Sequence, residues 1–306
     1  SYKNNDFCSV LCGIVLFLRF KCFHYNPSRA LMKIALYSRD GRAMSDGRLS
    51  RMFGKLEKES FDFYEISGGE DILPETDLVM SVGGDGTFLS ASQCVGQSGI
   101  PILGVNLGRL GFLSEYSPEE ACDALLSGGW YLEDRELLRT DVSGGALAAD
   151  PQFCPFTLNE VSVHRSGAAL LGIDVRMDGH PLPTYWADGL LVATSSGSTA
   201  YPLSVGGPIC APEAKVLIIA PIAPHNLNAR PLVVPDTTEI SISMRTRDDS
   251  VMLPMDNRNH LVEPSVSLDV KVAQFSLKRV RLKNTSFIKA LTTKLFWGED
   301  IRNSGE

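Results

Sequence analysis

Residues 77–87, DLVMSVGGDGT, join a near-continuous apolar run to a turn that contains three glycines. The apolar run predicts a strand that is buried on both faces of a parallel sheet. The glycines allow positive φ and close approach of a ligand to the backbone, and a helix predicted from Thr87 to Val95 would aim free N–H groups at the same place. The stretch predicts a phosphate site; a helix-capping turn with a structural Asp85 is the alternative.

Asp85 is unusual for a phosphate site, because a carboxylate repels an anion. It is better suited to act as a base, or to orient a hydroxyl group, beside the phosphate. The stretch is neither a P-loop nor a Rossmann fingerprint, since the spacing of both motifs is absent. The glycines of GVNLGRLGFL (residues 104–113) predict a second close backbone approach or a tight loop that packs on the sheet.

Outward from this turn, residues 32–136 alternate between strand and helix patterns, which predicts a doubly wound, Rossmann-like α/β domain. The expected strands are Lys33 to Tyr37, Phe61 to Ile66, Asp77 to Val82 and Ile100 to Val105, and the expected helices are Ser45 to Glu59, Thr87 to Val95 and one that begins at Ser117.

Residues 137–284 show strand-like stretches and little helical periodicity, so they predict a mostly β second domain. Asp178-Gly179 is a hairpin turn signal inside it.

Residues 1–31 contain a twelve-residue apolar run, Phe7 to Leu18, which is too short for a comfortable membrane span. We expect an extension outside the folded enzyme, with a membrane-associating tail as the alternative. A formal net charge of −7 argues against a general nucleic-acid binder. Seven cysteines without metal-ligand spacing indicate thiols in a reducing compartment.

Several further motifs follow GGDGT, and their spacing distinguishes between the protein families that share this turn. These are the Asn-Glu pair at residues 159–160, Asp188-Gly189, and ATSSGSTAY at residues 193–201. With GGDGT and GVNLGRLGFL, they make the chain resemble the NAD kinases from Met32 to about Phe296. Three departures stand out: Ser195-Ser196 replaces a usual Pro-Thr, Trp186 stands where many relatives have Arg, and Asp256-Asn257-Arg258 replaces Asp-Gly-Gln.

The resemblance implies a cytoplasmic enzyme that transfers the γ-phosphoryl group of ATP to the 2′-hydroxyl of the adenosine ribose of NAD, with Asp85 as general base. NAD and ATP are the implied small-molecule partners, with no nucleic acid and no membrane, and the implied assembly is a homo-oligomer, a dimer or tetramer. The resemblance also implies that the final segment, residues 285–306, returns to the first domain. A divalent metal, Mg²⁺, is expected on the donor phosphates because the glycine turn contains no lysine. The residues implied to contact nucleotide are Asp85, Gly86, Asn159, Glu160, Asp188, Ser196, Thr199, Ala200, Tyr201, Pro202, Leu203, Ser204 and Ala223.

Two other functions fit parts of the pattern. A lipid or sugar kinase shares the GGDGT turn but would need a different acceptor pocket. A non-catalytic nucleotide sensor could use the same pocket, although an intact Asp85 argues against it.

Overall fold

The computed structural model describes residues 31–39, 41, 45–108 and 111–297. Residues 1–30 lie outside this part, so the predicted extension stays a prediction. Within the described residues, no helix is both long and apolar enough to cross a membrane.

The first region is a parallel sheet covered by helices on both faces, as predicted. On the strand before GGDGT, Leu78 and Met80 pack with α1 (Gly47–Leu56) and α3 (Pro118–Ser127). Val79 packs with α2 (Asp85–Val95) on the opposite face. The elements are β1 (Met32–Tyr37), α1 (Gly47–Leu56), η2 (Glu57–Glu59), β2 (Phe61–Ile66), η3 (Gly69–Asp71), β3 (Leu78–Val82), α2 (Asp85–Val95), β4 (Ile102–Val105) and α3 (Pro118–Ser127).

The second region is mostly β, as predicted, and its two sheets pack on a shared apolar core. One sheet has the order β13-β12-β11-β7-β15-β16 and the other includes β10-β8-β14-β17. The strands are β5 (Trp130–Ser143), β6 (Phe156–Thr157), β7 (Glu160–Arg165), β8 (Leu171–Met177), β9 (His180–Pro181), β10 (Tyr185–Ala187), β11 (Gly189–Thr194), β12 (Val216–Ile222), β13 (Leu232–Pro235), β14 (Ile240–Arg245), β15 (Val251–Met255), β16 (Arg258–Val262) and β17 (Ser267–Leu282). The helical turns are η4 (Leu147–Ala149), η5 (Ser196–Thr199) and α4 (Tyr201–Ser204), and α5 (Phe287–Leu295) follows β17.

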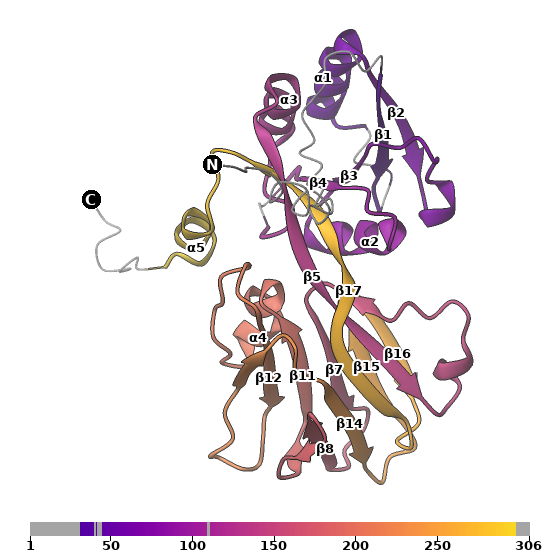
Figure 1. The fold of residues 1–306 in the computed structure, drawn as a ribbon, viewed down its shortest axis with the longest axis vertical. Coiled ribbons are helices and arrows are strands. Elements are labelled where there is room, and N and C mark those ends of the chain that lie inside the picture. Colours follow the sequence, from indigo (N-terminus) through magenta and orange to yellow (C-terminus); the bar gives the residue numbers. More distant parts are fainter. Residues whose placement is uncertain (1–30, 40, 42–44, 109–110, 298–306) are drawn as a thin grey trace, which may run out of the picture. The chain divides into compact units, whose positions relative to one another are not determined.

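Two long strands, β5 and β17, belong to both regions (Figure 1). They pair with each other in antiparallel register almost from end to end, while β17 also pairs with β4 of the first region and with β14 of the second. The expected domain boundary after residue 136 falls inside β5. One continuous sheet therefore joins the two regions.

Local sequence signals set the ends of several elements. Ser117 caps α3 and forms a capping box with Glu120, whose backbone N–H donates to the Ser117 hydroxyl over 3.2 Å. Asp178 and Gly179 both have positive φ, 49° and 78°, between β8 and β9, which confirms the hairpin turn.

Candidate active site

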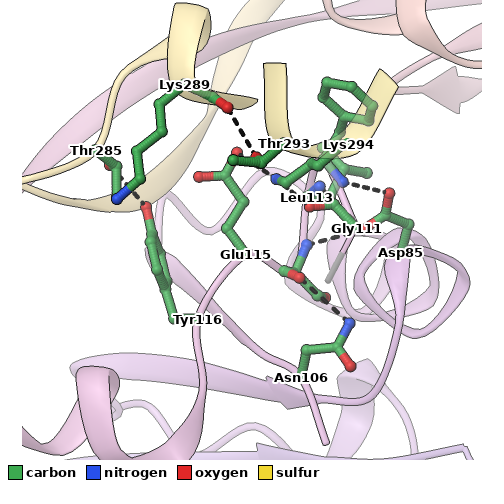
Figure 2. A network of polar contacts seen from close by, with 12 residues as sticks. Asp85, Asn106, Gly111, Leu113, Glu115, Tyr116, Thr285, Lys289, Thr293 and Lys294 are labelled. Carbon is green, nitrogen blue, oxygen red and sulfur yellow. Dashed lines mark hydrogen bonds and ion pairs between the residues drawn. The ribbon is translucent and has the colours of Figure 1, made fainter. Parts of the chain in front are cut away.

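Asp85, the first residue of α2, is held by the loop that contains GVNLGRLGFL. Its Oδ2 accepts a hydrogen bond from Phe112 N over 2.8 Å, and its Oδ1 accepts from Leu113 N and Ser114 N over 2.9 Å each. Figure 2 shows this carboxylate facing the loop. A Cβ on Gly111 would lie 1.9 Å from Asp85 Oδ1, so a larger residue cannot stand there. The second close backbone approach predicted from the glycines is therefore to Asp85.

The bonds leave the Asp85 carboxylate with room for another donor. Each carboxylate oxygen can accept about two hydrogen bonds. Oδ1 has two and Oδ2 has one from the described residues. Within this part of the chain, one position on Oδ2 thus has no donor and could accept from a hydroxyl group.

The first turn of α2 is open. Gly84 is exposed, has an ordinary φ of −81°, and a Cβ there would meet nothing within 4 Å. Gly83, in contrast, has a φ of 149°, and a Cβ there would lie 2.4 Å from Thr87 Oγ1. The fold explains Gly83, whereas no described atom crowds Gly84 at the positive end of the helix, the end that favours an anion.

Arg39, which follows β1, was missed by the sequence analysis. Its Nη1 lies 3.5 Å from the position of a Cβ on Gly86, so the guanidinium group is beside the glycine turn. The sequence places it 44 residues before Gly83, where the turn begins, and the parallel pairing of β1 with β3 brings the two together. Arg39 adds a positive charge near the helix end.

Asp256, in the turn between β15 and β16, binds the Asn-Glu pair of the second region. Its Oδ2 accepts from Leu158 N over 2.8 Å, and its Oδ1 accepts from Asn159 N over 2.9 Å and Glu160 N over 3.2 Å. Asp256 therefore positions the backbone of the Asn-Glu pair.

Asn257, the next residue, contacts α2. Its Nδ2 donates to Gly86 O over 3.1 Å and to Ser90 Oγ over 2.8 Å, and its Oδ1 accepts from Gln93 Nε2 over 3.1 Å. The turn of residues 256–257 therefore brings Asp85-Gly86 and Asn159-Glu160 to one place. The family's usual residue here is glycine, which has no side chain to make these bonds.

Glu160 is poised to bind a hydrogen-bond donor. Its Oε2 is buried and has no hydrogen-bond partner among the described residues. Burial, with a smaller contribution from the nearby Asp256 carboxylate, raises the pKa of Glu160 to about 8. A ribose hydroxyl or an amine would satisfy this group.

The loop of ATSSGSTAY packs directly on the Asn-Glu pair. A Cβ on Gly197 would lie 2.2 Å from Asn159 O, and Thr194 Oγ1 donates to Leu158 O over 2.7 Å. Ser195 has a φ of −56°, which a proline could also adopt, and its hydroxyl donates to Pro212 O over 2.9 Å. Ser196 Oγ accepts from Arg135 Nη1 over 3.1 Å.

Tyr201 and Asp188 lie near Glu160. The Tyr201 ring stacks on His164 with centroids 5.7 Å apart, so one of its faces is already covered. Asp188 forms an ion pair with Arg165 over 2.7 Å. Burial, with smaller contributions from the carboxylates of Glu160 and Asp188, raises the pKa of the Tyr201 hydroxyl. Asp188 N donates to Ile222 O. The next residue, Ala223, is exposed, has a φ of 46°, and is therefore close to Asp188.

The remaining residues predicted to contact nucleotide lie in η5, in α4 or, for Ala200, between them. Thr199 and Ala200 are partly exposed, and Pro202 is buried, with its carbonyl accepting from Gly207 N over 2.8 Å. Leu203 is partly exposed and Ser204 is exposed. Trp186 is 42% exposed, and the Arg245 guanidinium lies 5.8 Å from its ring centroid.

A buried group of charges, also missed by the sequence analysis, lies next to the loop that holds Asp85. Arg279 Nη2 donates to Phe112 O and Leu113 O over 2.9 Å each, and the same atom lies 3.2 Å from Glu115 Oε1. The charged residues of this group, which we call the buried charge cluster, are Glu115, Glu133, Arg135, Arg279, Arg281 and Lys294. The available signal was charge at alternate positions of two strands, 133 and 135 in β5 and 279 and 281 in β17, which places the charges of each strand on one face.

The final helix approaches this cluster. Lys294 of α5 donates to Gly111 O and lies 3.4 Å from Glu115 Oε1 (Figure 2). The Lys294 Nζ also lies 5.0 Å from the centroid of the Phe112 ring. The segment after β17 therefore contacts the loop of the first region that holds Asp85.

Comparisons with known proteins agree with this arrangement. Residues 46–127 match the ATP-NAD kinase N-terminal domain, and residues 158–282 match the ATP-NAD kinase C-terminal domain. An NAD kinase from Cytophaga hutchinsonii is 41% identical over 245 residues, 79% of this chain and 82% of that protein. An NAD kinase from Bacteroides fragilis is 36% identical over 293 residues, 89% of this chain and 100% of that protein.

Solved structures show the same fold. A yeast NADH kinase complexed with NADH has a TM-score of 0.77 at 21% identity, with 90% of each chain covered. An NAD kinase from Archaeoglobus fulgidus in complex with ATP has a TM-score of 0.66 at 27% identity, with 83% of this chain and 94% of that chain covered. From its motifs, its fold and these relatives, the chain belongs to the NAD kinase family, the enzymes that phosphorylate NAD.

Proposed function

We propose that this NAD⁺ kinase transfers the γ-phosphoryl group of ATP to the 2′-hydroxyl of the adenosine ribose of NAD, with Asp85 as the general base. The observation that carries the proposal is the position of the Asp85 carboxylate. It lies at the open end of α2, keeps an acceptor position on Oδ2, and is linked to Asn159-Glu160 through the turn of residues 256–257.

The proposed reaction is a direct displacement at the γ-phosphorus. The 2′-oxygen of the ribose forms a bond to phosphorus while the bond to the β–γ bridging oxygen breaks, and ADP leaves. The hydroxyl proton passes to Asp85 late in the transfer and then to solvent. The positive end of α2 and the Arg39 guanidinium stabilise negative charge on the phosphoryl group.

The acceptor nucleotide is held by groups around Glu160. Glu160 Oε2, which lacks a partner among the described residues, accepts from a ribose hydroxyl, and the Asn159 amide adds a donor and an acceptor. The loop from Ser196 to Ser204 packs on this pair and supplies hydroxyls and the partly exposed Tyr201. Gly86, Asp188 and Ala223 complete the proposed nucleotide contacts.

A divalent ion, Mg²⁺, is expected to enter with the donor. In the described ranges, no group of three or more His, Cys, Asp or Glu side chains could hold a metal ion. Mg²⁺ usually keeps several waters and binds through substrate phosphates. Its chemistry would be to neutralise charge on the donor phosphates.

We also propose a cytoplasmic homo-oligomer. The four described cysteines, Cys94, Cys122, Cys154 and Cys210, are free, as expected in a reducing compartment. Large apolar side chains of the β-rich region are exposed, among them Leu261 at 66% and Val233 at 50%. Light scattering of the purified protein measures the assembly directly.

The proposal is tested by incubating the purified protein with ATP, Mg²⁺ and NAD. We expect NADP, and we expect no product from an NAD analogue whose adenosine ribose lacks the 2′-hydroxyl. Asp85→Ala should abolish turnover while leaving NAD binding largely intact. Binding of NAD without any NADP would instead favour a sensor, and preferential phosphorylation of a lipid or sugar would favour a different kinase.

A further inference from the structure

Each N–H group that holds Asp85 belongs to a peptide unit whose carbonyl is bonded as well. The N–H of Phe112 shares its peptide unit with the carbonyl of Gly111. The N–H of Leu113 shares its unit with Phe112 O, and the N–H of Ser114 shares its unit with Leu113 O. In a planar trans peptide unit, the N–H and the carbonyl point in opposite directions. The three units therefore stand between the Asp85 carboxylate and the donors to their carbonyls.

Two cationic side chains donate to these three carbonyls. Lys294 Nζ of α5 donates to Gly111 O (Figure 2). Arg279 Nη2 of β17 donates to Phe112 O and to Leu113 O over 2.9 Å each. A hydrogen bond from a charged donor is roughly twice as strong as one between neutral groups, and it polarises the peptide unit so that the N–H at the other end donates more strongly. The two cations therefore strengthen all three hydrogen bonds on the opposite side of the loop.

Asp256 provides an internal comparison, because three successive N–H groups hold it too. Two of the peptide units concerned contain the carbonyls of Leu158 and Asn159. Leu158 O accepts from the Thr194 hydroxyl over 2.7 Å, and Asn159 O accepts from Thr194 N over 2.9 Å. Both donors are neutral. The same local arrangement is thus backed by cations at Asp85 and, in these two units, by neutral donors at Asp256.

Lys294 is held in place on the far side of the loop. Its side chain is 12% exposed, and its Nζ lies 3.4 Å from Glu115 Oε1. The same Oε1 lies 3.2 Å from Arg279 Nη2, so one carboxylate holds both cations. Of the nine residues of α5, all of which the structure describes, only Ala290 is buried. The helix therefore adds little to the apolar core, and the contacts of Lys294 join it to the loop.

We propose that Lys294 and Arg279 are positioning residues for Asp85, and that they act through the three peptide units that separate them from its carboxylate. The inference rests on the proposed role of Asp85 as general base. A base acts well only when the right oxygen faces the hydroxyl proton, and a misplacement of about 1 Å can cost a hundredfold in rate. A helix near the end of the chain thereby helps to set the rate of the proposed reaction.

Lys294→Met removes the charge and the donor from the peripheral helix. It is more informative than a change at Arg279, which is 1% exposed and whose loss endangers the fold. We expect kcat to fall about tenfold to a hundredfold, while the KM values for NAD and ATP stay within about threefold. Lys294→Arg keeps a cationic donor and should recover most of the lost kcat. Lys289→Met, the same change at an exposed position of α5, is the matched control and should leave kcat and the melting temperature unchanged.

A double-mutant cycle with Asp85→Asn tests whether Lys294 acts through Asp85. Asparagine cannot accept the hydroxyl proton, so its orientation no longer limits the rate. Lys294→Met should therefore lower kcat by less than about threefold in the Asp85→Asn background. A lysine that only stabilises the fold would lower kcat by the same factor in both backgrounds.

The outcomes separate this inference from the proposed function. If the native enzyme forms no NADP, or if Asp85→Asn keeps the native kcat, the proposed function fails. If Asp85→Asn loses activity and Lys294→Met keeps kcat within about threefold of the native enzyme, Lys294 does not position the base. Equal kcat values for Lys294→Met and Lys294→Arg, or equal factors in the two backgrounds, would also overturn the inference.

Discussion

Asp85 and Asp256 lie in different regions of the molecule, and the chain binds them in the same way. Each carboxylate accepts hydrogen bonds from three successive backbone N–H groups, those of residues 112–114 and 158–160. Asp85 stands beside the N-terminal end of α2, where Gly84 is exposed and no atom of the described residues crowds it. Asp256 sits in a hairpin turn whose next residue, Asn257, covers the same helix.

The difference shows how one local arrangement serves two purposes. Both carboxylates are partly exposed and have the same hydrogen-bond pattern, so their neighbours distinguish them: Asp85 begins α2 beside the exposed Gly84, whereas Asp256 adjoins Asn257, which is bonded to α2. Burial raises the pKa of Asp256, while the three N–H groups act in the opposite direction. We therefore assign catalysis to Asp85 and positioning of Asn159-Glu160 to Asp256.

The largest effect is expected for Asp85→Asn. An amide cannot accept the hydroxyl proton, so kcat should fall by about 10²- to 10⁴-fold, the range for loss of a general base. The dissociation constant for NAD should stay within about threefold. Steady-state NADP formation and calorimetric NAD binding measure the two quantities. A variant that keeps kcat within tenfold of the native enzyme would remove Asp85 from the chemistry.

Asp256→Ala should act mainly on stability. It leaves three N–H groups without their acceptor, and we expect the free energy of unfolding to fall by about 1–3 kcal/mol in urea denaturation. Asp178→Ala is the matched control, because Asp178 also has positive φ in a hairpin turn but its side chain accepts only from Glu239 N, over 2.9 Å, among the described residues. Equal losses in the two variants would mean that turn strain, not the bonds to residues 158–160, explains the effect.

Glu160→Gln should change the pH dependence of stability. The folded protein holds this proton more tightly than the unfolded chain, since the pKa rises from 4.5 to about 8. The contribution of Glu160 is fully present below pH 4.5 and is lost as the pH rises through about 8. Denaturation across that window should show a smaller decrease in the variant. An identical pH profile in both proteins would contradict the raised pKa.

The smallest effect is expected for Ser195→Pro, which restores the residue usual in the family. The φ of −56° suits proline, which should add about 0.4–1 kcal/mol. Loss of the hydrogen bond to Pro212 O removes a similar amount, so the net change should be below about 1 kcal/mol. A melting temperature that falls by more than about 5 °C would show that the loop needs the serine hydroxyl.

The elements with local signals were predictable from the sequence. The buried strand before GGDGT, the capped helix after Ser117 and the Asp178-Gly179 hairpin all lie where short patterns placed them. The continuous pairing of β5 and β17 was not predictable, because pairing between strands more than 100 residues apart leaves no local pattern.

The candidate site divides in the same way. Asp85 and the Asn-Glu pair carry family motifs, so the sequence identified them. The three N–H groups that hold Asp85, the position of Arg39 and the buried charge cluster depend on segments that only the folded chain brings together. Asn257 was noted as a departure, and its contacts with α2 required the structure.

The most direct test of the central claim is a crystal structure of the Asp85→Asn variant with NAD and a non-hydrolysable ATP analogue. Our account predicts that the 2′-oxygen of the adenosine ribose lies about 2.6–3.2 Å from the side chain of residue 85, with Glu160 bound to the same nucleotide. A ribose whose hydroxyls face solvent, or a nucleotide bound away from residues 85 and 160, would contradict it.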